Sequence, residues 1–172
     1  LPMTFPRSVG QIPIYYNYKN TGRPGPKNEV FWSHYNDEVN TPLYPFGYGL
    51  SYTTFEYSNI AIDNKILKKN NSINVSVELK NTGKFKGKEV VQLYIKDRYA
   101  SVTRPVRELK GFAMIELNPG ESKTVSFEIS ESLLRFYSAN EVWESEPGIF
   151  DIFIGTDSNA SLQENFKLIR KF

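Results

Sequence analysis

The run from Gly87 to Ser130 limits the fold of this chain more than any other stretch. Near its start, Val91, Leu93 and Ile95 alternate with Gln92 and other polar or amphipathic residues, which is the two-residue period of a strand with one buried face. The end of the run alternates in the same way, with three apolar positions two residues apart: Val125, Phe127 and Ile129. We therefore predict β-strands here, with Leu93 and Phe127 at the centre of a core and Gln92 facing outward.

The middle of the run predicts an antiparallel connection. Asn118-Pro119-Gly120 combines a fixed φ with a residue that accepts positive φ, so the chain must turn there. Before this turn the alternation changes phase, because Leu109 has the parity of Ile115 whereas Phe112 does not. A β-bulge at Gly111 is the simplest explanation.

Further strands follow from the alternation and turn residues elsewhere after Phe55. We also expect one helical turn at 130–134 and a small hairpin at 136–144 that carries Trp143. Short strands with almost no helix predict a two-sheet antiparallel sandwich of the immunoglobulin kind with about seven strands. The strands expected outside the central run are 55–62, 72–79, 148–155 and 165–170.

Residues 1–54 do not show the pattern of a self-sufficient domain. They contain seven of the ten prolines and no sustained period, yet they hold eleven aromatic residues. A disordered linker is normally poor in aromatic residues, so these rings are expected to be buried against something. We predict an irregular arm over 1–54, either mobile or folded over one face of a β domain at 55–172.

Composition excludes several functions. Lys and Arg number 21 against 19 for Asp and Glu, so no global field favours nucleic acid or an anionic membrane surface. There is no cysteine, and the single histidine leaves no cluster for a zinc ion, so we expect no metal and no cofactor. No apolar stretch approaches the roughly 20 residues of a membrane helix. The first residues, Leu1 to Thr4, lack the features of a signal peptide and an initiator Met, so the chain is expected to be part of something longer.

Several motifs of the central run coincide with one known family. The residues Tyr94–Asp97, Arg104-Pro105, Leu109–Phe112 and Pro119–Glu121 resemble the fibronectin type III-like module that closes many family 3 glycoside hydrolases, the β-glucosidases and β-xylosidases. Upstream, 1–17 resembles the end of their α/β sandwich domain, and 42–58 resembles the connector to the module.

The resemblance implies a role without catalysis for this chain. A retaining glycosidase needs two carboxylates, a nucleophile and an acid/base. In the family, these come from an N-terminal barrel and from the sandwich domain upstream of 1–17, so no catalytic residue is expected here. The chain is expected to brace the catalytic domains of a β-glucosidase that hydrolyses terminal β-linked glycosyl residues, in the periplasm or outside the cell.

The acidic residues of the β module are expected at the surface. Glu89, Asp97, Glu108 and Glu121 fall at strand ends or outward positions. We predict that Asp97 forms an ion pair with Arg104 and Arg107, which braces the long loop between two strands.

The arm supplies the candidate site residues, which either contact a sugar or pack between domains. Interdomain packing is the favoured interpretation, since no carboxylate stands at the sequence spacing from His34 that a triad or a metal site would show. One alternative is a carbohydrate-binding module with exposed rings at Trp32, Tyr35, Tyr44 or Trp143, and another is a separately encoded partner subunit. The candidates are Trp32, His34, Tyr35, Tyr44, Phe46 and Tyr48.

Overall fold

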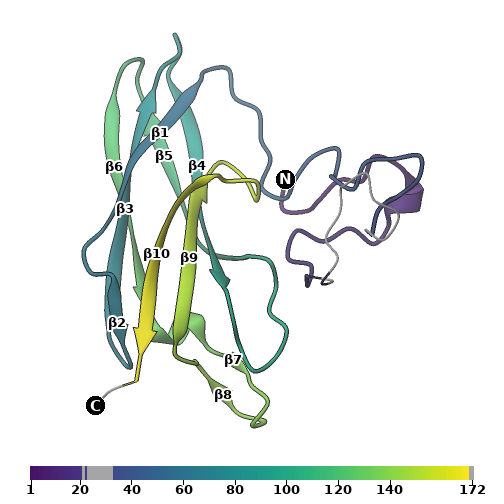
Figure 1. The fold of residues 1–172 in the computed structure, drawn as a ribbon. Helices are drawn as coiled ribbons and strands as arrows, with labels where there is room; N and C mark the ends of the chain where they lie inside the picture. Colours follow the sequence, from purple (N-terminus) through teal and green to yellow (C-terminus); the bar gives the residue numbers. More distant parts are fainter. Residues whose placement is uncertain (21, 23–32, 171–172) are drawn as a thin grey trace.

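The computed structural model describes residues 1–20, 22 and 33–170. Figure 1 shows a β-sandwich with the N-terminal arm folded against one side. Seven long strands form two antiparallel sheets, and the short β2 adds a parallel edge, so the predicted sandwich is confirmed. The first sheet has the order β1 (Phe55–Ile62), β3 (Ser72–Asn81), β6 (Ser122–Ser130), and the second the order β2 (Ile66–Lys68), β10 (Leu162–Ile169), β9 (Gly148–Gly155), β4 (Gly87–Asp97), β5 (Glu108–Leu117).

Most element boundaries match the sequence pattern. Strands β1 and β9 coincide with the expected ranges, whereas β10 begins three residues earlier than expected, at Leu162. The expected helical turn is the 3-10 turn η2 (Glu131–Leu134), and the expected hairpin consists of β7 (Phe136–Tyr137) and β8 (Trp143–Glu144). In the described part of the arm the one helical element is the 3-10 turn η1 (Val9–Gln11).

The predicted bulge lies in β5. Leu93 of β4 faces Gly111, but the next residue, Tyr94, faces Leu109, which leaves Lys110 as the extra residue. A Cβ atom on Gly111 would lie 3.2 Å from the ring of Phe127. Glycine therefore allows the bulged strand to approach β6 closely.

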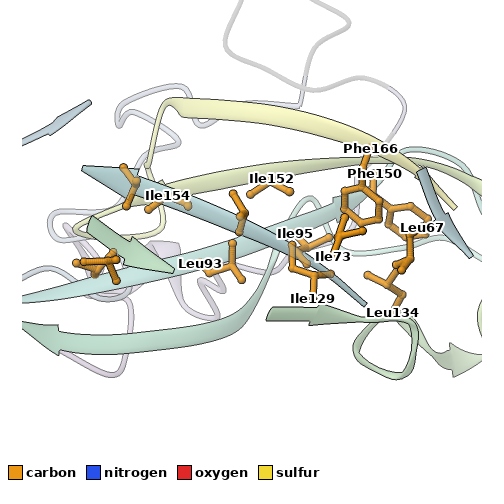
Figure 2. Packing of buried hydrophobic residues seen from close by; sticks show 14 of the residues in the cluster. Leu67, Ile73, Leu93, Ile95, Ile129, Leu134, Phe150, Ile152, Ile154 and Phe166 are labelled. Atoms are coloured by element: carbon orange, nitrogen blue, oxygen red, sulfur yellow. The ribbon is translucent and has the colours of Figure 1, made fainter. Parts of the chain in front are cut away.

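The core fills the space between the inner faces of the two sheets (Figure 2). Leu93 and Ile95 of β4 are buried there together with Ile152 and Ile154 of β9. Phe127 packs against this cluster but stays half-buried, because β6 is an edge strand of its sheet. Leu93 is thus central as predicted, whereas Phe127 lies at the margin of the core.

The outer face of β4 is also buried, contrary to prediction. Gln92 is 4% exposed and Tyr94 is fully buried, although both point away from the core. The reason is that the arm covers this face. A strand that alternates in sequence is therefore buried on both sides, because chain outside the sandwich supplies the second layer.

A single substitution tests the core. We expect Leu93→Ala to lower the free energy of unfolding by about 2 to 5 kcal/mol, through lost burial and a cavity. Phe112→Ala, on the neighbouring strand but 70% exposed, is the matched control and should change it by less than about 0.5 kcal/mol. Urea denaturation measures both, and equal losses would show that the register is wrong.

Candidate interdomain surface

The arm is folded and not an extended tail. Its first segment pairs with the segment before the sandwich, because the Phe5 N–H donates to the Tyr44 carbonyl at 2.9 Å. The buried side chain of Gln11 links the same two segments: its Nε2 donates to the Val39 carbonyl at 2.7 Å and its Oε1 accepts from the Arg7 N–H at 2.6 Å. The arm therefore has a defined shape with few regular elements.

The segment from Tyr44 to Tyr48 organises the aromatic side chains of the arm. Tyr44 meets Phe5 edge-on, with centroids 6.3 Å apart, and lies tilted against Tyr48 at 4.9 Å. Phe46, in the same segment, stacks on Tyr16 at 4.3 Å. Tyr16 in turn contacts the buried ring of Tyr94 on β4, at 5.9 Å. One run of rings thus connects the arm to the sandwich.

Backbone N–H groups of the sandwich donate several hydrogen bonds to the arm. The Ser158 N–H donates to the Phe46 carbonyl at 2.8 Å, and the Val106 N–H donates to the Tyr18 carbonyl at 2.9 Å. The Leu109 N–H donates to the Tyr16 hydroxyl at 3.2 Å. Edge strand β5, the β4–β5 loop and the β9–β10 loop therefore hold the arm against β4.

Gln92 is the central polar contact of this interface. Its Nε2 donates to the Gly47 carbonyl at 3.2 Å and also to the Thr156 carbonyl, while its Oε1 accepts from the Tyr94 hydroxyl at 2.6 Å. A buried amide with these partners is satisfied and costs little to bury. Burial raises the pKa of the Tyr94 hydroxyl, which stays protonated and donates.

Arg107 holds the β9–β10 loop, which binds the arm through Ser158. Its Nη1 donates to the carbonyls of Ser158 and Ala160, at 2.6 and 3.0 Å, and its guanidinium lies 4.2 Å from the centre of the Phe153 ring. Burial lowers the pKa of Arg107. Sequence reasoning expected Arg107 to pair with Asp97, and that prediction is wrong because the side chain binds the loop after β9 instead.

Asp97 is not the surface carboxylate that the sequence suggested. Its Oδ1 accepts from the Tyr99 N–H at 3.3 Å, and its buried Oδ2 has no hydrogen-bond partner among the described residues. Burial raises the pKa of Asp97 to about 6. Arg104 pairs with Glu108, at 2.6 Å, and not with Asp97.

Glu89 is also buried more than expected, whereas Glu121 is exposed. The hydroxyl of Tyr57 donates to Glu89 at 2.8 Å, and burial raises the pKa of this carboxyl group.

Among the described residues, no group of three or more His, Cys, Asp and Glu side chains is arranged to hold a metal ion.

The described candidate residues differ in exposure and surroundings. Trp32 lies outside the described residues, and His34 and Tyr35 lie exposed on the loop before Asn40. Tyr44 is 39% exposed, whereas Phe46 and Tyr48 are half-buried. Sequence reasoning did not identify the residues that form the interface between the arm and the sandwich. These are Tyr16, Gln92, Tyr94 and Arg107. Gln92 and Tyr94 share one strand face, which was the available signal for a covered surface.

The chain is similar to known proteins in both sequence and structure. Residues 89–158 match the family described as fibronectin type III-like domain. A crystal structure of the β-glucosidase from Listeria innocua in complex with glucose superposes with a TM-score of 0.90 and 43% identity, over 98% of this chain and 24% of that one. The superposition includes the arm as well as the sandwich.

Over nearly its whole length, the chain matches the C-terminal, fibronectin type III-like region of family 3 β-glucosidases.

Two curated relatives give the same extent of match. The periplasmic β-glucosidase of Salmonella typhimurium is 50% identical over 171 residues, which is 98% of this chain and 22% of that protein. A β-xylosidase of Formosa agariphila is 45% identical over 160 residues, 93% of this chain and 21% of that protein. The chain therefore spans about a fifth of the length of these glycosidases.

A substitution at Gly47 tests the packing of the arm against Gln92. Gly47 has φ +86°, and a Cβ there would lie 2.2 Å from the Oε1 of Gln92. Gly47→Ala should cost about 2 kcal/mol of stability or more, from backbone strain and displacement of Gln92. Gly49→Ala is the control, since nothing lies within 4 Å of its added Cβ. Thermal melts check this, and similar melting temperatures for the two variants would contradict the packing described.

Asp97 gives a pH test. Its folded pKa, about 6, lies above the unfolded value, so the folded state holds the proton more tightly. This contribution to stability is full below about pH 4 and is lost as pH rises to about 6. The difference in unfolding free energy between wild type and Asp97→Asn should therefore change across this window and be constant above it. A difference independent of pH would show that folding does not shift the pKa of Asp97.

Proposed function

We propose that this chain is a non-catalytic part of a glycosidase that removes terminal β-linked glycosyl residues, and that its arm braces the catalytic domains. The observation that carries the proposal is the exposed apolar surface of the arm. Val9, Leu50 and Tyr52 are 83%, 89% and 98% exposed. A soluble protein rarely leaves so many large apolar side chains in water unless another surface covers them. Others exposed on the arm are Met3, Ile12, Tyr15, Tyr18, Val39 and Leu43.

The arrangement of the rings supports docking more than sugar binding in the arm. The rings of Tyr44 and Tyr48 contact each other, and the ring of Phe46 stacks on Tyr16. Rings that contact one another in this way leave no open row of coplanar faces. We infer that the ring side of the arm binds the sandwich, while its exposed aliphatic and tyrosine side chains bind the catalytic domains.

The two parts of the chain then have separate roles. We propose that 55–172 is the fibronectin type III-like domain and that 1–54 is the tail of the upstream α/β sandwich domain plus a connector. The start of β1 at Phe55 and the continuous core of the sandwich support this division.

The name of one relative supports a proposal about the cellular location. The β-glucosidase of Salmonella typhimurium is named periplasmic, and we propose a periplasmic or extracellular location for this chain. No helix in the described part of the chain is long and apolar enough to cross a membrane.

Because one relative is a β-glucosidase and another a β-xylosidase, we infer that other domains select the sugar.

The proposal predicts that the purified chain is inactive and that it assists a catalytic partner. The chain alone should not hydrolyse an aryl β-glucoside. A Salmonella typhimurium β-glucosidase truncated before its matching region should be unstable, and adding the chain should restore part of its stability or activity. Turnover by the chain alone, abolished by changing one of its own carboxylates, would contradict the proposal.

Matched variants locate the docking surface. Tyr52→Ser should leave the melting temperature of the free chain unchanged but weaken rescue of the truncated enzyme, since Tyr52 is 98% exposed in the chain. Ile66→Ser, on β2 and 48% exposed, is the control and should rescue normally. Equal rescue by both variants would exclude this part of the arm from the interface.

A further inference from the structure

The hairpin β7–β8 projects from the end of the sandwich, away from the arm (Figure 1). Tyr137 lies directly opposite Trp143 in its register. Residues opposite each other in an antiparallel pair point to the same face, with Cβ atoms about 5 Å apart. Tyr137 is 62% exposed and Trp143 is 71% exposed. Two large aromatic side chains therefore lie next to each other in solvent.

The hairpin that carries them is well fixed. The Ser138 N–H donates to the Val142 carbonyl at 3.0 Å, and the Ser138 hydroxyl donates to Glu144 at 2.6 Å. The Asn140 amide donates to the same carboxylate oxygen at 3.0 Å, and the Ala139 N–H donates to the hydroxyl of Ser101 in the β4–β5 loop, at 3.2 Å. The rings are thus held on a scaffold that needs little ordering when a ligand binds.

Anchoring of the hairpin does not explain the exposed pair. Phe136, on the other face of β7, is 2% exposed, and the guanidinium of Arg104 covers its ring at 4.3 Å. This buried side chain already attaches the hairpin to the sandwich. A cross-strand aromatic pair adds little to the stability of a hairpin. Tyr137 and Trp143 therefore remain available for contact with a ligand.

We propose that Tyr137 and Trp143 form a binding platform for a β-linked oligosaccharide or glucan chain. A pyranose ring with equatorial hydroxyl groups has an apolar C–H face that stacks on an aromatic ring, and its hydroxyl edge remains free for polar groups. The hairpin also carries exposed polar side chains, because Asn140 and Glu141 lie in the turn between the two strands that bear the rings.

The surroundings favour a sugar over a protein partner. Apart from the two rings, the hairpin exposes one other large apolar side chain, Val142, among polar residues of β7 and β8 and the turn between them. Stable protein interfaces bury about 800 Å² on each partner, with an apolar centre. The site is also separate from the arm surface. The choice of β-linked chains rests on the proposed function, whereas the platform itself does not.

The test is a titration of the 172-residue chain with cellohexaose, laminarihexaose and, as the α-linked comparison, maltohexaose. In the wild type, binding is located by NMR through the Trp143 indole N–H signal, assigned with Trp143→Phe, and the affinities of the wild type and all variants are measured by isothermal titration calorimetry. We expect at least one β-linked hexasaccharide to shift this signal and to bind more tightly than maltohexaose. Trp143→Ala should weaken binding roughly tenfold or more, Tyr137→Ala several-fold, and Trp143→Phe less than Trp143→Ala, as for other aromatic stacking contacts.

Phe112→Ala is the matched control, since Phe112 is equally exposed, at 70%, but lies on β5. It should bind like wild type. The proposal is overturned if wild type binds no β-linked hexasaccharide at millimolar concentrations, or if Trp143→Ala binds like wild type while its melting temperature shows a folded chain. It is also overturned if the truncated β-glucosidase competes with the sugar for Trp143. Those results leave rescue through Tyr52 unaffected, so the two proposals fail separately.

Discussion

The arrangement of the arm on the sandwich depends on the hydrogen bonds of the buried Gln92 side chain. Its amide binds the Gly47 carbonyl of the arm and the Thr156 carbonyl of the sandwich, and its oxygen binds the Tyr94 hydroxyl. Without the arm, a satisfied polar network and a fully buried tyrosine would face water. The interface is therefore specific as well as apolar, because the loop that covers Gln92 must present a carbonyl there and must have no side chain at Gly47.

The same interface explains why the arm has so little regular structure and yet a defined shape. Its prolines prevent helices and strands, but Gln11 and the pairing of Phe5 with Tyr44 satisfy its backbone locally. While Phe46 and Tyr16 pack toward β4, the arm leaves Val9, Leu50 and Tyr52 exposed. The arm thus has one set of side chains used within the chain and another that the proposed function assigns to the catalytic domains.

The sequence predicted the sandwich well because alternation and turns are local signals. The bulge at Gly111 and the limits of β1 and β9 follow directly from parity and turn residues. The outer face of β4 was predicted wrongly, since parity shows which residues share a face and not what covers that face.

Partners distant in sequence were predicted poorly for a related reason. The charges near Asp97 suggested an ion pair with Arg104 and Arg107, but Arg104 binds Glu108 and Arg107 binds backbone carbonyls. Which of several nearby charges pair depends on burial and loop geometry, which local pattern does not give. The motif resemblance identified the family correctly, because many coincident positions had to match along one strand and its loops.

Hydrogen exchange of the amides at the arm interface tests the central claim most directly. Ser158 and Leu109 donate their N–H groups to the arm, to the Phe46 carbonyl and the Tyr16 hydroxyl. If the arm is docked on β4, both amides should exchange slowly in the free chain, and amides near Leu50 should become protected only when the catalytic domains are added. Fast exchange at Ser158 and Leu109, as in an open loop, would show that the arm does not cover the sandwich and would contradict the account.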